Sequence, residues 1–352
     1  MKRIIQADLH AFSLLELIVS LALASTVATV ATMTLRTASD QAVRIEDRNL
    51  TDAEAKVVFE QVVYRLRAIG GNGLSPRAAI WVQNRVAGTV KSYGNALLAF
   101  PADEMPDLKP NTDSVAFVVP RQDFQPCVIR SRVGGSQQIS VTGHQCCVAS
   151  EVLNQQILLV SPEGKVSARL LPVNKTCAAG SCADGCSLAM DATVMNLNTV
   201  EAQLAVQGEG FVGGQLTLES DRSALYVNTN DELILVRESG ASIERSVIAE
   251  SILDLQIAVG VDSNGDGLAR LPSASLAPAD DEWLWNGSDG NEGVLGTSPV
   301  RMLGFGIVMK GDFSVPGQLR QVQLLDGEAH SSAQYLRGLY GQVALRNQPE
   351  FQ

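Results

Sequence analysis

The segment Asp262–Gly267 places oxygen-bearing side chains at alternate positions and ends in glycine. It reads Asp-Ser-Asn-Gly-Asp-Gly. This is the D-x-N-x-D-G form in which oxygens at positions 1, 3 and 5 converge on Ca²⁺ and the glycine permits a sharp turn. The pattern predicts a calcium site formed by Asp262, Asn264, Asp266 and the Leu268 carbonyl.

The second half of the calcium pattern is absent. Arg270 stands at position 9, and Ser273 stands at position 12 where a bidentate Glu is expected. A complete cage would need Asp280, Asp281 or Glu282 to fold back onto the loop. The alternative is an Asx-rich turn, because Asn-Gly and Asp-Gly favour turns without an ion.

Six cysteines form the second group of reactive side chains. They are Cys127, Cys146, Cys147, Cys177, Cys182 and Cys186. If the segment after the N-terminal anchor is exported, all six face an oxidising compartment, so we expect disulfides, with 15 pairings open. The rival is a zinc site on Cys177, Cys182 and Cys186. It lacks a Cys-x2-Cys pair and a nearby histidine.

Nucleophile machinery is missing from the sequence. No G-x-S-x-G or P-loop pattern occurs, and of the three histidines His10 lies in the N-terminal leader. His144 and His330 are far apart in sequence and are isolated from nucleophile motifs. We therefore expect a protein that is not an enzyme.

The apolar run Phe12–Leu35 is the longest feature of the chain. It contains one ionisable side chain, Glu16, and neither Gly nor Pro, and it is long enough to cross a hydrocarbon core of about 30 Å. Lys2 and Arg3 precede it, which favours a cytoplasmic N-terminus and export of everything that follows. An ionised carboxylate in lipid costs about 2.5 kcal/mol or more, so Glu16 needs a partner.

Cleavage between Ala11 and Phe12 would create that partner. A small residue stands before the apolar run rather than after it, unlike the cleavage site of a secretory signal peptide. The new α-ammonium group of Phe12 is poorly placed for Glu16 of its own helix. Between two helices offset by about one turn, however, the ammonium of one can pair with the carboxylate of the other.

The residues Ala11-Phe12-Ser13-Leu14-Leu15-Glu16-Leu17 resemble the N-terminal motif of type IV prepilins. The resemblance implies removal of a leader (1–11) by a prepilin peptidase, N-methylation of Phe12 and polymerisation through the apolar helix. Ala11 stands where Gly is usual, and the helix-kinking Pro of many major pilins is missing.

Shorter matches resemble the PilW-type minor pilins. They are Tyr64–Gly70, Ile252–Gln256, Val259–Asp262, Val300–Val308 and Gln342–Asn347. The resemblance implies a subunit that helps start pilus assembly near the fibre tip, working with other minor and major pilins and the inner-membrane assembly platform. It implies an inner-membrane location with a periplasmic head. The alternatives are a type II secretion pseudopilin, whose head is usually smaller, and a membrane-anchored periplasmic enzyme or binding protein.

The amino-acid composition and net charge of the chain indicate which kinds of partner it can bind. The 352-residue chain has a net charge of −11 and is 45% hydrophobic and 5% aromatic. An acidic chain is a poor general binder of phosphates, since affinity for nucleic acid depends on Lys and Arg. We expect a membrane-associated protein with a packed core and no nucleic-acid partner.

A long helix and a β-rich head are expected to position the candidate residues described above. Helix formers continue after Leu35, and Val58, Val62, Leu66 and Ile69 recur at the spacing of a buried face. We expect an α+β, pilin-like fold: the polymerisation segment 12–35, an amphipathic helix half 36–70 and a mainly antiparallel head 71–352. Two sub-domains would meet near 187–200.

Short apolar runs separated by turn residues predict the strands of the head. They are Ala79–Gln83, Gly88–Ser92, Ala96–Phe100, Ser114–Pro120, Gln138–Thr142, Gln156–Val160, Val166–Leu171, Val200–Val206, Gln215–Glu219, Ala224–Asn228, Glu232–Arg237, Leu253–Val261, Val300–Met309, Leu319–Leu325 and Tyr335–Arg346. Ser246–Ile252 reads as either a helix or a strand.

Overall fold

The structure is a computed structural model of the chain, and it is described here for the residues whose placement is defined. These are 14–70, 76–86, 89–95, 98–100, 102–119, 127–133, 138–142, 157–161, 167–170, 172–177, 186–190, 211–218, 222–239, 242–269, 282–285, 300–314 and 319–345. The chain divides into two compact units, Met1–Leu50 and Thr51–Gln352.

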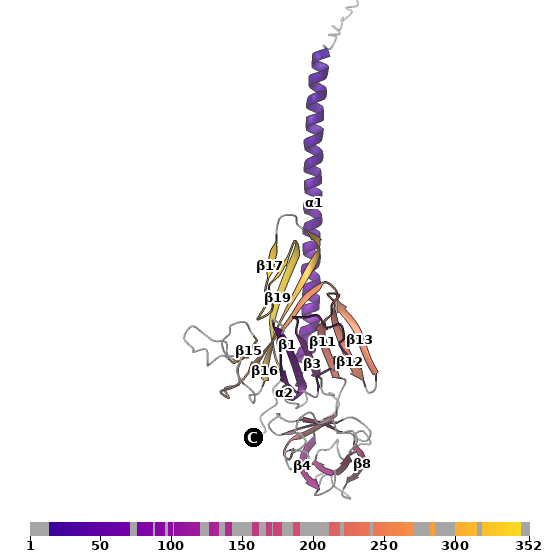
Figure 1. Cartoon of the computed structure of the whole chain (residues 1–352), viewed down its shortest axis with the longest axis vertical. Helices are drawn as coiled ribbons and strands as arrows, with labels where there is room; N and C mark the ends of the chain where they lie inside the picture. The colour runs from indigo at the N-terminus through magenta and orange to yellow at the C-terminus, as the bar shows by residue number, and fades with distance from the viewer. Residues whose placement is uncertain are drawn as a thin grey trace, which may run out of the picture. The chain divides into compact units, whose positions relative to one another are not determined.

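Helix α1 (Leu14–Arg67) is the longest element (Figure 1). Residues 14–50 are exposed apart from a partly exposed Asp47, and the first buried residue is Thr51. Val58, Val62 and Leu66 are at most 5% exposed, and Ile69 follows them into the core. The buried face predicted from the 3–4 spacing is therefore confirmed. The helix ends as the chain turns through Gly70, whose φ of 74° suits glycine.

A six-stranded sheet follows a short helix, α2 (Pro76–Ala79). Its strand order is β13-β12-β11-β3-β1-β2. The strands are β1 (Ile80–Val86), β2 (Thr89–Gly94), β3 (Ser114–Val118), β11 (Arg222–Val227), β12 (Leu233–Ser239) and β13 (Ser242–Ala249). Ala96–Phe100, predicted as a strand, forms none over its described part 98–100, where the Leu98 N–H instead closes a turn on the Asn95 carbonyl.

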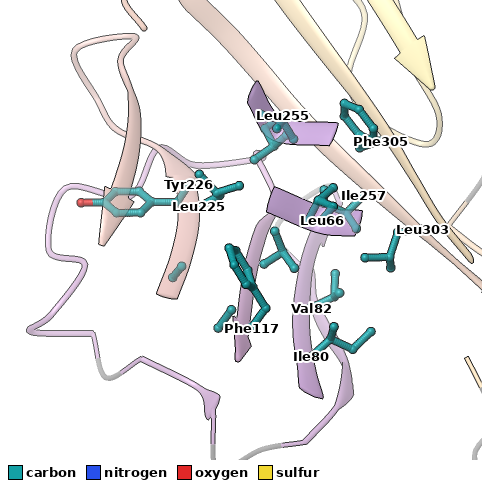
Figure 2. Packing of buried hydrophobic residues seen from close by; sticks show 14 of the residues in the cluster. Leu66, Ile80, Val82, Phe117, Leu225, Tyr226, Leu255, Ile257, Leu303 and Phe305 are labelled. Atoms are coloured by element: carbon teal, nitrogen blue, oxygen red, sulfur yellow. The ribbon is translucent and has the colours of Figure 1, made fainter. Parts of the chain in front are cut away.

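A four-stranded sheet lies beside it in the core and has the order β15-β14-β16-β19. Its strands are β14 (Ile252–Val261), β15 (Trp283–Leu284), β16 (Val300–Ser314) and β19 (Gln334–Ala344), and a separate hairpin pairs β17 (Arg320–Val322) with β18 (His330–Ser332). Figure 2 shows side chains of α1 and of both sheets converging, among them Leu66, Val82 and Phe305.

The third sheet is an insertion. Its strand order is β7-β6-β10-β4-β5-β9-β8. In the sequence it is inserted between β3 and β11, which pair directly with each other as antiparallel strands, with Val118 opposite Arg222. Its strands are β4 (Cys127–Val133), β5 (Gln138–Thr142), β6 (Ile157–Val160), β7 (Ser167–Leu170), β8 (Pro172–Cys177), β9 (Cys186–Met190) and β10 (Gln215–Leu218).

The third sheet contains strands from both sides of the predicted boundary near 187–200, because β10 lies beyond that region in sequence and pairs with β4 and β6. The boundary itself stays a prediction. All strand pairs in the described residues are antiparallel. The coarse prediction of one long apolar helix and a mainly antiparallel β domain is therefore confirmed.

Candidate functional site

The N-terminal part of α1 satisfies its polar side chains internally. Each Ser and Thr hydroxyl between Leu14 and Thr37 donates to a carbonyl three or four residues earlier, from Ser20 on Leu17 to Thr37 on Met33. A hydroxyl bonded in this way adds little cost in hydrocarbon, where an unsatisfied polar group is expensive. Between Leu14 and Leu35, Glu16 is the only ionisable side chain.

Of the three residues predicted to act in processing and assembly, the structure places Glu16. It lies in the first turn of the described helix and is exposed. Ala11 and Phe12 lie outside the described residues. Within the described residues, α1 is the one helix long and apolar enough to cross a membrane, and its position near the N-terminus is that of a membrane anchor or a signal sequence.

The predicted calcium loop begins at a buried carboxylate. The side chain of Asp262 is fully enclosed, and its Oδ2 accepts hydrogen bonds from Nε and Nη2 of Arg301 at 3.0 and 2.9 Å. The backbone N–H groups of Gly265 and Gly267 donate to Oδ1 and Oδ2 at 2.7 and 2.9 Å. Both glycines have φ near 80°, a region that side chains disfavour.

The other oxygens of the loop also face N–H groups. Asn264 Oδ1 accepts from the Asp266 N–H, and Asp266 Oδ1 accepts from the Leu268 N–H. Glu282 folds back as a closing acid would, but its Oε1 accepts from the Ser263 N–H and hydroxyl at 2.9 and 2.7 Å. The loop therefore forms consecutive Asx turns. Its first carboxylate, that of Asp262, pairs with Arg301 rather than with an ion.

The folded loop therefore does not fit the calcium cage that the pattern predicts. Among the described residues no group of three or more His, Cys, Asp or Glu side chains converges as metal ligands do. Calcium stays a prediction, and binding would require the ion to displace Arg301 from Asp262.

Arg301 is the residue that sequence reasoning missed at this site. It lies far from Asp262 in sequence, and the pairing of Val261 with Val300 across β14 and β16 brings the two together. The available signal was the burial expected for Asp262 directly after an apolar strand, because a buried carboxylate requires a cationic or N–H partner.

The predicted disulfide residues that the structure describes, Cys127, Cys177 and Cys186, lie in the inserted sheet. Cys127 and Cys186 are at most 1% exposed, and both are disulfide-bonded. A bonded Cys186 is unavailable as a zinc ligand. The backbone of Cys177 lies opposite Cys186 in the β8–β9 pair. Cys146, Cys147 and Cys182 lie outside the described residues.

Comparisons with known proteins add no assignment. No protein-family model, curated protein or solved structure matches this chain.

Proposed function

We propose that the chain is a minor pilin of a type IV pilus that helps start pilus assembly. In this proposal a prepilin peptidase removes residues 1–11, Phe12 becomes the methylated N-terminus, and the helix from Phe12 to Leu35 anchors the subunit in the inner membrane. Its partners are other minor and major pilins and the inner-membrane assembly platform. The head is periplasmic until the subunit enters the fibre near its tip.

One observation supports the proposal above the others: Glu16 is the only ionisable side chain between Leu14 and Leu35. The hydroxyl groups of the same segment are bonded within the helix, as Thr29 is to Ser25. A carboxylate in hydrocarbon is costly and marks a functional contact by default. The α-ammonium of a neighbouring Phe12 would lie at the same depth and would neutralise it.

The burial pattern of α1 is consistent with this role. One face of α1 is buried from Thr51 onward, and residues 14–50 are exposed apart from the partly exposed Asp47. The uncovered part includes large apolar side chains throughout, such as Leu14, Leu23 and Leu35, each more than 60% exposed. Exposed apolar surface of this extent requires lipid or other helices around it.

The test has two parts. Mass spectrometry of the mature protein is expected to show N-methylated Phe12 as the first residue. Glu16→Ala is expected to insert into the membrane normally and to lower the number of pili, while Glu46→Ala, an acid on the same helix beyond the apolar segment, leaves piliation unchanged. Retention of residues 1–11 in a host that processes pilins, or normal piliation with Glu16→Ala, contradicts the proposal.

A genetic readout separates the pilus from secretion. Deletion of the gene is expected to abolish twitching motility and leave type II secretion intact. Loss of secretion with normal twitching would identify a pseudopilin instead.

A further inference from the structure

Three cysteines of the inserted sheet stand at the ends of strands. Cys127 is the first residue of β4, Cys177 is the last residue of β8, and Cys186 is the first residue of β9. Cys127 and Cys186 are both disulfide-bonded. Because the two Cα atoms of a disulfide usually lie about 4.4–6.8 Å apart, the register of the strands limits which cysteines can be their partners.

Cys127 and Cys186 are too far apart to bond to each other. Strand β5 lies between β4 and β9 in the sheet. It places Thr142 opposite Val128 of β4 and Val141 opposite Cys186 of β9. Two strands that flank a third are about 10 Å apart, which exceeds the range for a disulfide. Each of the two bonded cysteines therefore has its own partner among the other four.

Cys177 occupies the position directly opposite Cys186. The β8–β9 register runs from Asn174 opposite Ala189 to Cys177 opposite Cys186 without a further shift. Directly opposite residues of antiparallel strands have Cα atoms about 4.5 or 5.5 Å apart, and both positions belong to the same face of the sheet. Either separation lies within the range for a disulfide. The backbone alone thus brings these two positions to bonding distance.

The face of the sheet that carries Cys186 is buried. Cys186 is 1% exposed, and Val141, its neighbour on β5, is fully buried. Ile129 on β4 lies opposite Val141 and is also buried. A thiolate on such an apolar face would be a costly buried charge, whereas a disulfide carries no charge. The surroundings of Cys186 therefore favour a sulfur partner on the adjacent strand.

We propose that Cys177 and Cys186 form a disulfide across the β8–β9 pair, which fastens the outermost strand of the inserted sheet to its neighbour. Strand β8 is last in the order of that sheet, and within the described residues it pairs with β9 alone. A strand held from one side only can separate at its end, and a covalent bond at its last residue prevents this. The bond is independent of the assembly role proposed above.

Thiol–disulfide exchange forms the bond. The co-reactant is an oxidised thiol–disulfide oxidoreductase, the class of oxidant that exported proteins meet. The thiolate of one cysteine attacks the disulfide of the oxidoreductase, and the second thiolate then displaces the oxidoreductase sulfur from the mixed disulfide. Two cysteine thiols are oxidised to one disulfide, the oxidoreductase disulfide is reduced to two thiols, and the two cysteine protons end on those thiols.

The proposed bond restricts the pairing of the other cysteines. The partner of Cys127 is then Cys146, Cys147 or Cys182. When all six cysteines are oxidised, the four that remain allow three pairings, compared with 15 for the whole set. The bond also removes two of the three thiols of the alternative zinc site, since a disulfide sulfur is not a zinc ligand.

Peptide mapping of the oxidised full chain tests the bond. The chain is exported to an oxidising compartment, extracted in detergent, alkylated to block free thiols, and digested with trypsin and an Asp-specific protease without reduction. These proteases separate residues 176–183, which contain Cys177 and Cys182, from residues 184–190, which contain Cys186. We expect the two peptides to be linked. Tandem mass spectrometry that breaks the chain between the two cysteines of the first peptide is expected to assign the link to Cys177.

Two single variants form a matched pair. Cys182→Ser is expected to keep the link between the two peptides, and Cys177→Ser is expected to lose it. The double variant Cys177→Ser/Cys186→Ser is expected to shift the melting temperature by the same amount as either single variant, because all three lack the same bond. A wild-type chain in which Cys186 is linked to any other cysteine, or in which Cys177 is alkylated, overturns the proposal. The wild-type map decides this even where a variant fails to fold.

Discussion

The ring of Phe59 on α1 stacks on the ring of Phe305 on β16, with centroids 4.7 Å apart and planes inclined by 28°. This contact joins the helix to the four-stranded sheet at the fully buried Phe305. Aromatic pairs in this geometry contribute beyond the area they bury.

Phe59→Ala is accordingly expected to lower the free energy of unfolding of the Thr51–Gln352 unit by about 2 kcal/mol, less than for a fully buried Phe because Phe59 is partly exposed. Val57→Ala on the exposed side of the same helix is the control and is expected to change it by less than about 0.5 kcal/mol. Urea titration followed by near-UV circular dichroism measures both. Equal effects would mean that the stacked pair does not hold the helix.

Gly341 on β19 is the strand partner of Phe305 and lies against the same Phe59 ring. A Cβ at Gly341 would overlap the Phe59 ring. Gly341→Ala is expected to destabilise the fold by about 2 kcal/mol through overpacking. In Phe59→Ala the same change should cost much less, because the space is then free. A double-mutant cycle checks this, and additive effects would contradict the contact.

The ion pair of Asp262 and Arg301 leads to a test of the calcium prediction. Because the guanidinium already neutralises the buried carboxylate, we expect a chelator to leave the melting temperature of the wild-type protein unchanged. Arg301→Gln is expected to lower the free energy of unfolding by about 3 kcal/mol, since it leaves a buried charge unpaired. Thermal unfolding with and without Ca²⁺ measures both effects. A wild-type protein stabilised by Ca²⁺ would show that the ion displaces Arg301, as the sequence pattern predicts.

Asp231 gives the stability of the head a dependence on pH. Burial raises the pKa of Asp231, but hydrogen bonds and charges of Lys109 and Lys310, at 2.6 and 2.7 Å, outweigh burial and lower it overall. A lowered pKa means stabilisation that is present above the unfolded value and lost as pH falls through the folded value.

Asp231→Asn is therefore expected to cost about 1.5 kcal/mol at pH 7 and almost nothing below pH 2. Asn is the suitable replacement because it tolerates the φ of 63° at this position. Denaturant titrations at the two pH values measure the difference. A cost that does not change with pH would assign the effect to geometry rather than charge.

The sequence could predict those parts of the fold that depend on the spacing of residues close together in the chain. The buried face Val58–Ile69 follows from helical spacing, and the β11–β12 pair follows from the short apolar runs Ala224–Asn228 and Glu232–Arg237. Strand β13 was ambiguous because it is an edge strand exposed over most of its length, so no alternation marks it. Strand β4 was missed altogether.

The buried sites depended on distant residues and were harder to predict. Asp113, Asn84 and Asp326 meet only because strand register brings three separate segments together, and no spacing in the sequence indicates it. The Asp262 loop shows the opposite case. Its local turn geometry was foreseen as the alternative to an ion, whereas its cationic partner Arg301 was not.

The inserted sheet predicts a separable part of the molecule. Val118 and Arg222 are paired residues on adjacent antiparallel strands, so a short turn can join β3 to β11 without disturbing either. All six cysteines lie between these two residues. Replacement of residues 120–220 by Asn-Gly is therefore expected to leave a folded chain without cysteines, whose core no longer depends on oxidation.

The insertion does contribute to the main core through Leu158 and Val160 of β6, which are at most 3% exposed and belong to the same buried cluster as α1. Their loss is expected to cost about 2 kcal/mol each and to lower the melting temperature without abolishing cooperative unfolding. Circular dichroism of the shortened chain in detergent measures this, with Leu158→Ala in the full chain as the control. An aggregated or molten product would show that the six-stranded sheet requires the insertion. In that case the head would have to be regarded as one cooperative unit built around both sheets.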